Sequence, residues 1–190
     1  MVLGAALVLA ALSLFLWNQW EDRAAGDASD QVLEKLLDQV GETGVPLPEP
    51  DLSPMTEVEI DGYAYIGYLS IPVLELKLPV MSEWDDTRLK IAPCRYSGST
   101  KTDDMVIAGH NYIRHFGPLK NLSVGDAVYF QDMDGVVSVY EVAEIDTLAP
   151  TAVEDMTDSG YALTLFTCTY GGQSRMTVRC SRINDAENTD

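Results

Sequence analysis

The chain has 190 residues, of which 46% are hydrophobic, and 30 acidic against 12 basic residues give it a net charge of −18. This length and apolar content predict one folded domain with its own core. A surface this negative repels phosphate backbones, which argues against nucleic-acid binding. Its three cysteines cannot all pair, and a secreted disulfide scaffold would use more of them, so at least one thiol is free.

The first twenty residues are almost wholly apolar. No charge interrupts the run from Val2 to Trp17, which spans about 24 Å as a helix at ~1.5 Å per residue. A hydrocarbon core is ~30 Å thick, and Trp17 and Trp20 suit the aromatic belt at its surface. We therefore predict a transmembrane anchor over residues 1–20. A cleaved signal peptide, with small residues at 24–26, is the alternative.

Residues 21–61 are expected to hold an amphipathic helix and a proline-rich strap. The helix spans 29–41, where Ser29 or Asp30 caps its start and Gly41 ends it. One of its faces carries Val32, Leu33, Leu36, Leu37 and Val40. We expect this face to pack on the domain, with an oligomer contact as the alternative. The four prolines of residues 45–54 predict an extended strap, and a lid over the site is the second interpretation.

Residues 62–184 are expected to form the folded domain, followed by a polar tail over 185–190, and their pattern is mostly β. Every second residue from Leu74 to Val80 is apolar, which is typical of a half-buried strand. Asp134-Gly135 is a strong hairpin signal. Strands are expected over 65–72, 73–81, 105–110, 127–132, 136–146, 162–170 and 175–183, with Pro72 dividing the first two. Seven or eight short strands favour a barrel or a sandwich, which the hydrophobic pattern alone does not separate.

One predicted hairpin places a cysteine opposite an arginine. If Gly171-Gly172 is a two-residue turn, then Cys168 faces Arg175. Directly opposed side chains on antiparallel strands stand ~4.5–5.5 Å apart at Cβ. In the same register Arg179 faces Thr164, further along that face. The register therefore selects Arg175 as the partner of Cys168.

Two histidines are available to complete a nucleophilic site. A thiol with the ordinary pKa of ~8.5 is mostly protonated at neutral pH, but a guanidinium favours the thiolate and an imidazole accepts its proton. His110 ends the apolar run VIAGH, where a side chain emerges at a barrel rim, whereas His115 lies in a loop. We predict His110 as the partner of Cys168 and keep His115 as the lesser candidate.

Several segments resemble the motifs of one enzyme family. TLFTC (164–168) resembles the Thr-Leu-x-Thr-Cys signature of sortases, the membrane-anchored cysteine transpeptidases of Gram-positive bacteria. VIAGHN (106–111) resembles their histidine motif. RMTV (175–178) resembles their arginine element. GYLSIPVLELKLPV (67–80) resembles their early strand pair, and LKNLSVGDAVYF (119–130) resembles the segment that follows their histidine. The resemblance covers about residues 62–183, with the motifs in family order.

The resemblance implies a fold, a reaction and a location. The fold is a closed eight-stranded β-barrel with short helices. The reaction is cleavage of a C-terminal sorting signal of the Leu-Pro-any-Thr-Gly type, or a variant, through a thioacyl-enzyme that an amine resolves. That amine belongs to a cell-wall peptide precursor or to a pilin lysine, and no metal or other cofactor is needed. The location is the cell membrane, with a single span and the catalytic domain outside the cell.

The resemblance also implies roles for four residues. Cys168 is the nucleophile, and His110 protonates the leaving amine and later deprotonates the incoming one. Arg175 donates hydrogen bonds to the tetrahedral oxyanion and to the substrate backbone. Thr167 is a candidate substrate contact, with an ordinary strand residue as the alternative.

The class of sortase stays open. One class carries a long helical insertion before the cysteine strand, and here only a short loop separates Thr147 from Tyr161. The helix expected over 30–40 is nevertheless frequent in that class. The acidic residues of the short loop could hold calcium, as in some members, although a solvated loop is the preferred interpretation; they are Glu154, Asp155 and Asp158.

Three other functions remain as alternatives. The first is a cysteine peptidase that only hydrolyses, which would use the same residues. The second is a non-catalytic, membrane-anchored surface β-domain in which Cys168 is merely buried. The third is a redox pair of Cys168 and Cys180, which the register disfavours because it places Cys180 opposite Leu163. Cys94 and Cys180 are interpreted as small buried residues.

Overall fold

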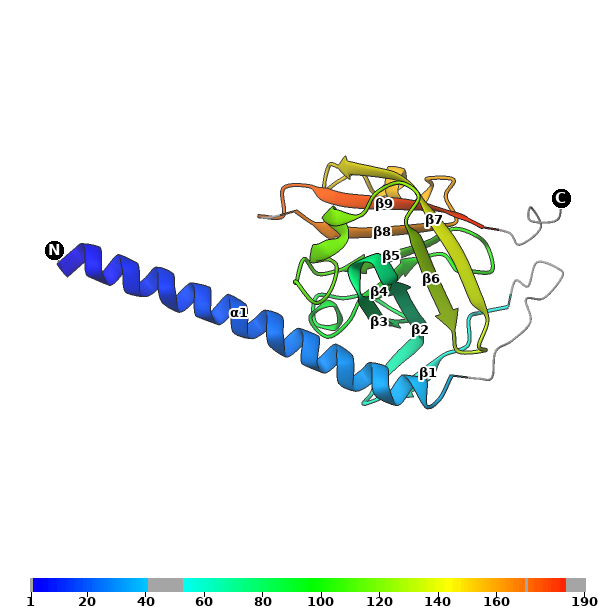
Figure 1. Ribbon diagram of the computed structural model, residues 1–190, viewed down its shortest axis with the longest axis horizontal. Coiled ribbons are helices and arrows are strands. Elements are labelled where there is room, and N and C mark those ends of the chain that lie inside the picture. Colours follow the sequence, from blue (N-terminus) through cyan, green and yellow to red (C-terminus); the bar gives the residue numbers. More distant parts are fainter. Residues whose placement is uncertain (1, 41–52, 170, 184–190) are drawn as a thin grey trace.

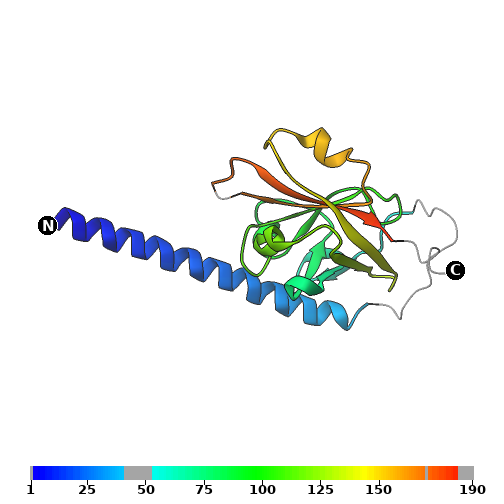
Figure 2. The same ribbon diagram turned by 45° about the horizontal axis from the view of Figure 1, so that its top comes forward.

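A long N-terminal helix leads into a rolled-up β-sheet (Figure 1). The structure is a computed structural model that describes residues 2–40, 53–169 and 171–183. The expected strap over 45–54 lies largely outside the described residues, as does the tail over 185–190. Helix α1 (Val2–Leu37) extends well beyond the barrel at its N-terminal end, while its C-terminal part lies against the barrel (Figures 1 and 2).

Helix α1 is uninterrupted, so the prediction of a separate helix that starts at a Ser29 or Asp30 cap is wrong. Residues 21–28 contain three alanines and no proline, and packing of Ala25 and Ser29 on the domain holds the helix through Gly26, which has a low helix propensity. The helix ends at Leu37, where the N–H groups of Gln39 and Val40 both donate to the carbonyl of Leu36.

The C-terminal half of α1 packs on the outside of the barrel, as expected. Four of its side chains are buried at helical spacings of three and four, and these are Ala25, Ser29, Val32 and Leu36. Val32 and Leu36 join a cluster with residues of the first four strands, including Tyr65 and Cys94. Burial of this apolar stripe therefore fixes the second half of the helix to the domain.

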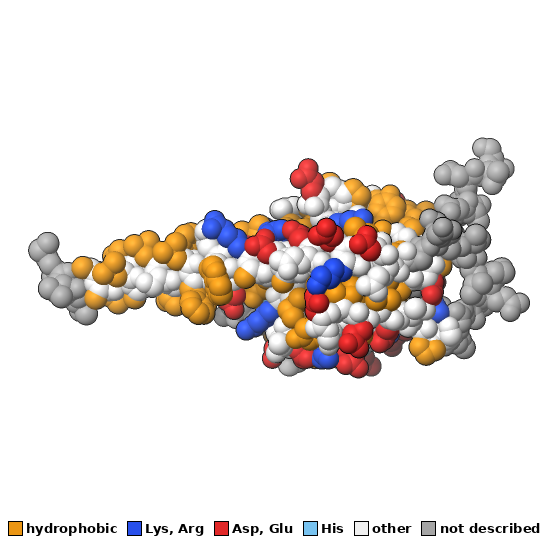
Figure 3. Space-filling view, turned by 90° about the horizontal axis from the view of Figure 1, so that it is seen from below, with side chains coloured by type: hydrophobic (Ala, Val, Ile, Leu, Met, Phe, Trp, Pro, Cys, Tyr) orange, Lys and Arg blue, Asp and Glu red, His pale blue; other side chains and the backbone are white. Residues whose placement is uncertain are grey.

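The N-terminal half of α1 has a different surface. Its exposed large side chains are Leu7, Val8, Leu9, Leu12, Leu14, Phe15, Leu16, Trp17 and Trp20. They form the apolar surface that covers the projecting part of the helix in Figure 3, whereas charged side chains gather over the barrel. Within the part of the chain that the structure describes, no helix has the length and apolar character that a membrane crossing requires. The transmembrane anchor therefore stays a prediction.

The sheet closes on itself. Its strands are β1 (Val58–Ile60), β2 (Tyr63–Ile71), β3 (Leu76–Met81), β4 (Cys94–Ser97), β5 (Met105–Gly109), β6 (Ala127–Asp132), β7 (Val137–Leu148), β8 (Leu163–Cys168) and β9 (Arg175–Arg182). They follow the order β1-β2-β3-β4-β5-β8-β9-β7-β6, and β6 pairs back onto β2. Strands β2 to β9 thus form a closed ring of eight, and β1 extends it as a hairpin on β2. The predicted closed eight-stranded barrel is confirmed.

Short helices connect the strands. They are η1 (Pro72–Leu74), η2 (Arg88–Lys90), η3 (Gly117–Asn121) and α2 (Val153–Thr157). Pro72 opens η1 and so divides β2 from β3, as predicted. Helix α2 is only five residues long, which confirms that the connection before β8 holds no long helical insertion.

The sequence patterns found seven of the nine strands. The two that they missed, β1 and β4, have three and four residues and are too short to show a clear alternation. Strand β1 lies within residues 21–61, for which only a helix and a strap were predicted, and follows the strap of residues 45–54. The Asp134-Gly135 hairpin is present between β6 and β7, where the Asp132 carboxylate accepts hydrogen bonds from the N–H groups of Asp134 and Val136.

Side chains alternate between the inside and the outside of the barrel. Met105 and Ile107 on β5 lie in the main core together with Leu163 and Leu165 on β8. The intervening residues lie in a separate outer cluster, which contains Val106, Ala108, Phe166 and Met156. This period of two follows from the pleat of a strand, and it decides on which surface each functional side chain stands.

Gly67 lies where the barrel closes. It pairs with both Val80 on β3 and Asp132 on β6, next to an irregularity in the β2–β3 register. Its φ is +147°, and a Cβ at this position would lie 2.1 Å from the carbonyl oxygen of Gln131. A residue larger than glycine therefore separates β2 from β6.

We expect Gly67→Ala to lower the free energy of unfolding by about 2 to 4 kcal/mol, since backbone strain and steric overlap add. Gly125→Ala is the matched control, because its φ of +97° is also positive but a Cβ there meets nothing within 4 Å. The control should lose about 1 kcal/mol. Urea unfolding measures both, and equal losses would contradict the role of Gly67 in closure.

Candidate active site

Three strands bring His110, Cys168 and Arg175 to one end of the barrel. Strands β5 and β8 are parallel neighbours, and Gly109 at the end of β5 pairs with Thr167. The next residues along, His110 and Cys168, therefore lie side by side where the two strands end. Strand β9 is antiparallel to β8 and places Arg175 directly opposite Cys168, which confirms the predicted register.

The turn between β8 and β9 holds this register. Gly171 and Gly172 have φ values of +82° and +71°, which only glycine adopts at little cost. The N–H of Gly172 donates to the carbonyl of Thr169 at 2.8 Å, and the N–H of Thr169 donates to the carbonyl of Ser174 at 3.0 Å. The two glycines therefore position Arg175 opposite Cys168.

The three residues stand on the outer surface of the barrel rim. On β8, Leu163 and Leu165 point into the core, so Cys168 falls on the outer face with Phe166. The same alternation assigns His110 to the outer face of β5. A site on this face is open to a polypeptide substrate, whereas the interior is filled by side chains.

Arg175 has no carboxylate partner among the residues that the structure describes. Its Nη1 donates to the carbonyl oxygens of Gly172 at 3.1 Å and Ser174 at 3.2 Å. Among the described residues it forms no ion pair, although the chain has 30 acidic residues. The guanidinium is thus held by the turn and remains available to a negative charge that develops beside Cys168.

His110 is partly buried against Tyr112, with ring centroids 4.7 Å apart and planes inclined by 34°. Burial lowers the pKa of His110 below the ordinary value, and the positive charge of Lys90 acts in the same direction. Asp86 and Glu21 oppose the shift. Neutral His110 is therefore the main form at neutral pH, and it can accept a proton from a thiol or an amine.

His115, the lesser sequence candidate, has a different environment. Its side chain is 0% exposed, and its Nε2 donates to the carbonyl of Ala25 on α1 at 3.3 Å. Its Nδ1 has no hydrogen-bond partner among the described residues. Burial lowers the pKa of His115 to about 4. These contacts attach α1 to the loop after β5 and leave no surface for a substrate.

Thr167, the candidate substrate contact, lies on the inner face. Its side chain is 3% exposed, and its Oγ1 has no partner among the described residues. Alternation explains this placement, because Thr167 precedes the outward-facing Cys168. This burial gives no support to a direct substrate contact, which stays an untested prediction.

The three cysteines differ in accessibility. Cys168 is half-buried, whereas Cys94 and Cys180 are fully buried, and all three thiols are free. Burial raises the pKa of both Cys94 and Cys180 to about 12. Cys180 pairs with Leu163 in the sheet, as the register predicted, and lies in the main core away from Cys168. Accessibility therefore selects Cys168 as the reactive thiol.

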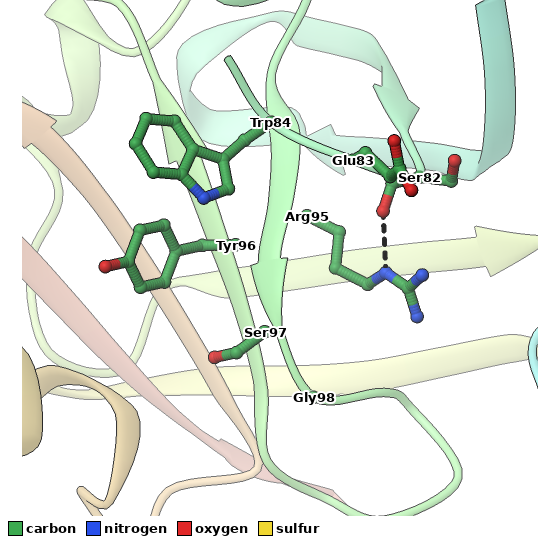
Figure 4. A pocket seen from close by; sticks show the side chains of 7 residues that line it. All are labelled: Ser82, Glu83, Trp84, Arg95, Tyr96, Ser97 and Gly98. Atoms are coloured by element: carbon green, nitrogen blue, oxygen red, sulfur yellow. Dashed lines mark hydrogen bonds between the residues drawn. The ribbon is translucent and has the colours of Figure 1, made fainter.

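An aromatic surface extends from the candidate site across β4. The Tyr96 ring meets Phe166 edge-on, with centroids 5.4 Å apart, and Trp84 lies 5.2 Å on the other side of Tyr96. Trp84 and Tyr96 border an open pocket of about 370 Å³ (Figure 4). Arg95 borders its opposite side, where Nε donates to the carbonyl of Ser82 at 2.9 Å. No sequence pattern indicated this surface, because β4 is too short to show a clear alternation.

Sequence comparison identifies a family. The family described as "Sortase domain" matches residues 69–183. The chain belongs to the sortase family. It is 27% identical over 128 residues to Sortase A of Bacillus anthracis, in a match that covers 64% of this chain. The match spans 60% of that relative's length, which is less than two thirds of it.

Solved sortase structures are similar to this one. Sortase C1 of Streptococcus agalactiae is 28% identical, with a TM-score of 0.57 over 67% of this chain and 72% of that chain. Sortase C1 of Streptococcus suis is 29% identical, with a TM-score of 0.54 over 65% of this chain and 76% of that chain. The relatives carry names of two sortase classes, and the class of this chain therefore stays open.

In this sortase Arg179 binds the acidic loop before β8 through a backbone carbonyl. Arg179 Nη1 lies 3.1 Å from Glu144 Oε2, and its Nη2 donates to the carbonyl of Asp155 at 3.2 Å. The hydroxyl of Tyr161 donates to the same carboxylate at 3.1 Å. Across the described ranges no group of three or more histidine, cysteine or acidic residues is placed to hold a metal ion. The calcium alternative for Glu154, Asp155 and Asp158 stays untested.

Burial of neutral His115 predicts a loss of stability in acid. Its pKa of about 4 in the folded protein lies below the ordinary 6.5, so the unfolded protein binds the proton more tightly. The contribution of His115 to the free energy of unfolding is fully present above pH 6.5 and is lost as the pH falls towards 4. The pKa difference between the folded and unfolded protein corresponds to a loss of ~3 kcal/mol.

Urea unfolding of wild type and His115→Gln between pH 4 and 7 measures this effect. We expect the free energy of unfolding of the variant to depend less on pH, because glutamine does not titrate. At pH 7, the difference in the free energy of unfolding between wild type and the variant measures the loss of packing alone. Parallel curves for the two proteins would show that His115 does not titrate as described.

Proposed function

We propose that this sortase is a cysteine transpeptidase that cleaves a C-terminal sorting signal and transfers the acyl group to an amine. The observation that carries the proposal is the register of β5, β8 and β9. It places Cys168 beside His110 and opposite Arg175 on one accessible face. Membership of the sortase family agrees with this reaction.

In the first half of the reaction, the Cys168 thiol gives its proton to neutral His110, and its sulfur attacks the carbonyl carbon of the scissile peptide bond. A C–S bond forms, and the carbonyl oxygen gains a negative charge. Arg175 donates hydrogen bonds to this oxyanion. The C–N bond then breaks, and His110 supplies the proton that the leaving amine needs, which leaves a thioacyl-enzyme.

In the second half, an amine attacks the thioester carbonyl and gives its proton to His110. A C–N bond forms, and the C–S bond breaks to restore the thiolate. We propose that the amine belongs to a cell-wall peptide precursor or to a pilin lysine, and that the acyl donor is a surface protein or pilin. One similar solved structure is named Sortase C1 of a pilus island, which supports the pilin version.

We propose that the aromatic surface of Trp84, Tyr96 and Phe166 receives apolar side chains of the sorting signal. The three rings form a continuous contact chain that ends two residues before Cys168 on the same face. Trp84 is 46% exposed and therefore free to cover apolar atoms. A proline and a leucine, the apolar residues of the expected signal, would bury area there.

We also propose that α1 attaches the protein to the cell membrane as a single-pass anchor, with the barrel outside the cell. The exposed apolar side chains between Leu7 and Trp20 support this proposal. Figures 1 and 2 both show the β8–β9 turn on the side towards which α1 projects, so the site would face the membrane.

A peptide with a Leu-Pro-any-Thr-Gly signal tests the proposed function. We expect wild type to form a thioacyl-enzyme, seen by mass spectrometry, and Cys168→Ala to form none, because it lacks the attacking sulfur. Cys94→Ala is the matched control, since it removes a buried thiol and leaves Cys168 in place.

An added amine then distinguishes transfer from hydrolysis. Ligated product that grows with amine concentration supports transfer, and release of free acid alone would support the hydrolytic alternative. Wild type that captures no peptide from a library of signal variants, with all three thiols equally inert to alkylation, would favour the non-catalytic alternative.

Arg175→Lys tests the oxyanion contact. We expect kcat/KM to fall about 10²- to 10³-fold, because one ammonium cannot reproduce the fork of donors of a guanidinium. Arg182→Lys on the same strand should stay within a few fold of wild type, since Arg182 binds Asp103 and Ser138 at the far end of β9. Equal activity of wild type and Arg175→Lys would remove Arg175 from the mechanism.

A further inference from the structure

The loop that follows β5 is fixed at both of its ends to the barrel. It begins at His110 and leads to η3 at Gly117. The N–H of Phe116 donates to the carbonyl of His110 at 3.0 Å, and the Phe116 side chain is fully buried. A Cβ on Gly109 would lie 2.4 Å from the Phe116 ring, so this ring packs directly on the end of β5.

The outer part of the same loop is held by α1 instead of the barrel. The Asp22 carboxylate accepts a hydrogen bond from the N–H of Ile113 at 2.7 Å. Arg114 Nη1 lies 2.6 Å from Asp27, and its Nη2 pairs with Asp30. One stretch of α1, residues 22–30, therefore satisfies both a backbone donor and a guanidinium of the loop.

Close packing reinforces these polar contacts. A Cβ on Gly26 would lie 2.4 Å from the Arg114 side chain, so the arginine lies flat on the helix at this point. The buried His115 donates to the carbonyl of Ala25 one residue earlier on α1. The loop and the helix thus interlock, and neither can shift without breaking several contacts.

Tyr112 links the loop to the candidate base, His110, through ring contacts. Its ring lies 4.7 Å from that of His110 and 5.6 Å from that of the helix-bound His115. The N–H groups of His115 and Gly117 both donate to the carbonyl of Tyr112, at 3.1 and 2.9 Å. Tyr112 is therefore fixed through its backbone and packs against one side of the His110 imidazole.

We propose that α1 positions the base of the active site, with Asp22, Arg114 and Tyr112 as positioning residues that hold the His110 ring in its reactive place. The proposal rests on the proposed function, in which His110 transfers protons. It gives the packed half of α1 a role that anchoring does not require. The imidazole must face Cys168 for proton transfer, and an error of about 1 Å in such a position can lower a rate ~10²-fold.

The charged groups around His110 come from three elements. They are Lys90 on η2, Asp86 in the loop before η2 and Glu21 on α1, and Glu21 also lies 3.9 Å from Lys90. Neutral Tyr112 and the neutral, buried His115 complete the surroundings. Neither Asp22 nor Arg114 is among the charges that shift the His110 pKa, so their replacement tests position and not direct electrostatics.

The experiment compares four variants of the full chain in the peptide-transfer assay. Asp22→Ala removes the acceptor for the Ile113 N–H, and Asp22→Asn keeps an acceptor oxygen without the charge. Arg114→Ala removes both ion pairs. Lys35→Ala is the matched control, because it breaks another α1–barrel ion pair, with Asp61, at the opposite end of the packed half.

We expect kcat to fall at least ~10-fold in Asp22→Ala and Arg114→Ala, with KM for the peptide within about twofold of wild type, because proton transfer and not binding is impaired. Asp22→Asn should recover most of the activity, and Lys35→Ala should equal wild type. Unchanged kcat in both alanine variants, or an equal fall in Lys35→Ala, would overturn the proposal.

A second readout does not depend on activity. The chain has only two histidines, so their ring protons can be followed individually by NMR through a pH titration. Loosening the loop hydrates His110, and its lowered pKa should therefore rise towards the ordinary 6.5 in Asp22→Ala and Arg114→Ala but not in Lys35→Ala. An unchanged His110 pKa would overturn the positioning role. Wild type that forms no thioacyl-enzyme would instead refute the proposed function and leave this titration to decide the position of His110.

Discussion

The parallel pairing of β5 with β8 is the constraint on which the candidate site depends. Parallel neighbours end at the same edge of a sheet, so residues far apart in the sequence emerge together. The pairing of Gly109 with Thr167 sets His110 beside Cys168, and the antiparallel β9 adds Arg175. Closure of the barrel between β2 and β6 then leaves only the outer surface of this edge open to a substrate.

The candidate oxyanion-binding group is a cation in a strongly acidic chain. The net charge is −18, yet the guanidinium of Arg175 has no carboxylate partner among the described residues. Other arginines are neutralised, as Arg179 is by Glu144 and Arg114 by Asp27 and Asp30. The guanidinium of Arg175 therefore stays free of a carboxylate at the position where acyl transfer would create an oxyanion.

Helix α1 combines two surfaces in one element. Its first half exposes large apolar side chains, and its second half buries a stripe on the barrel and contacts the loop after His110. The helix is continuous from Val2 to Leu37, so its first half is joined directly to the half that packs on the barrel. Whatever holds the first half would therefore also set the orientation of the site.

The sequence by itself determined the strands of the main alternating runs, a glycine turn between β8 and β9 and the pairing of Cys168 with Arg175. These features follow from local periodicity and from a turn that fixes its own register. The strand that ends at His110 also selected this histidine over His115, and the motif resemblance supplied the closed barrel. Tertiary structure alone decided that Thr167 and His115 are buried, that Trp84 and Tyr96 form an aromatic surface with Phe166, and that the unbroken α1 contacts the loop after β5. Such features depend on contacts between segments that are distant in the chain, which no local pattern records.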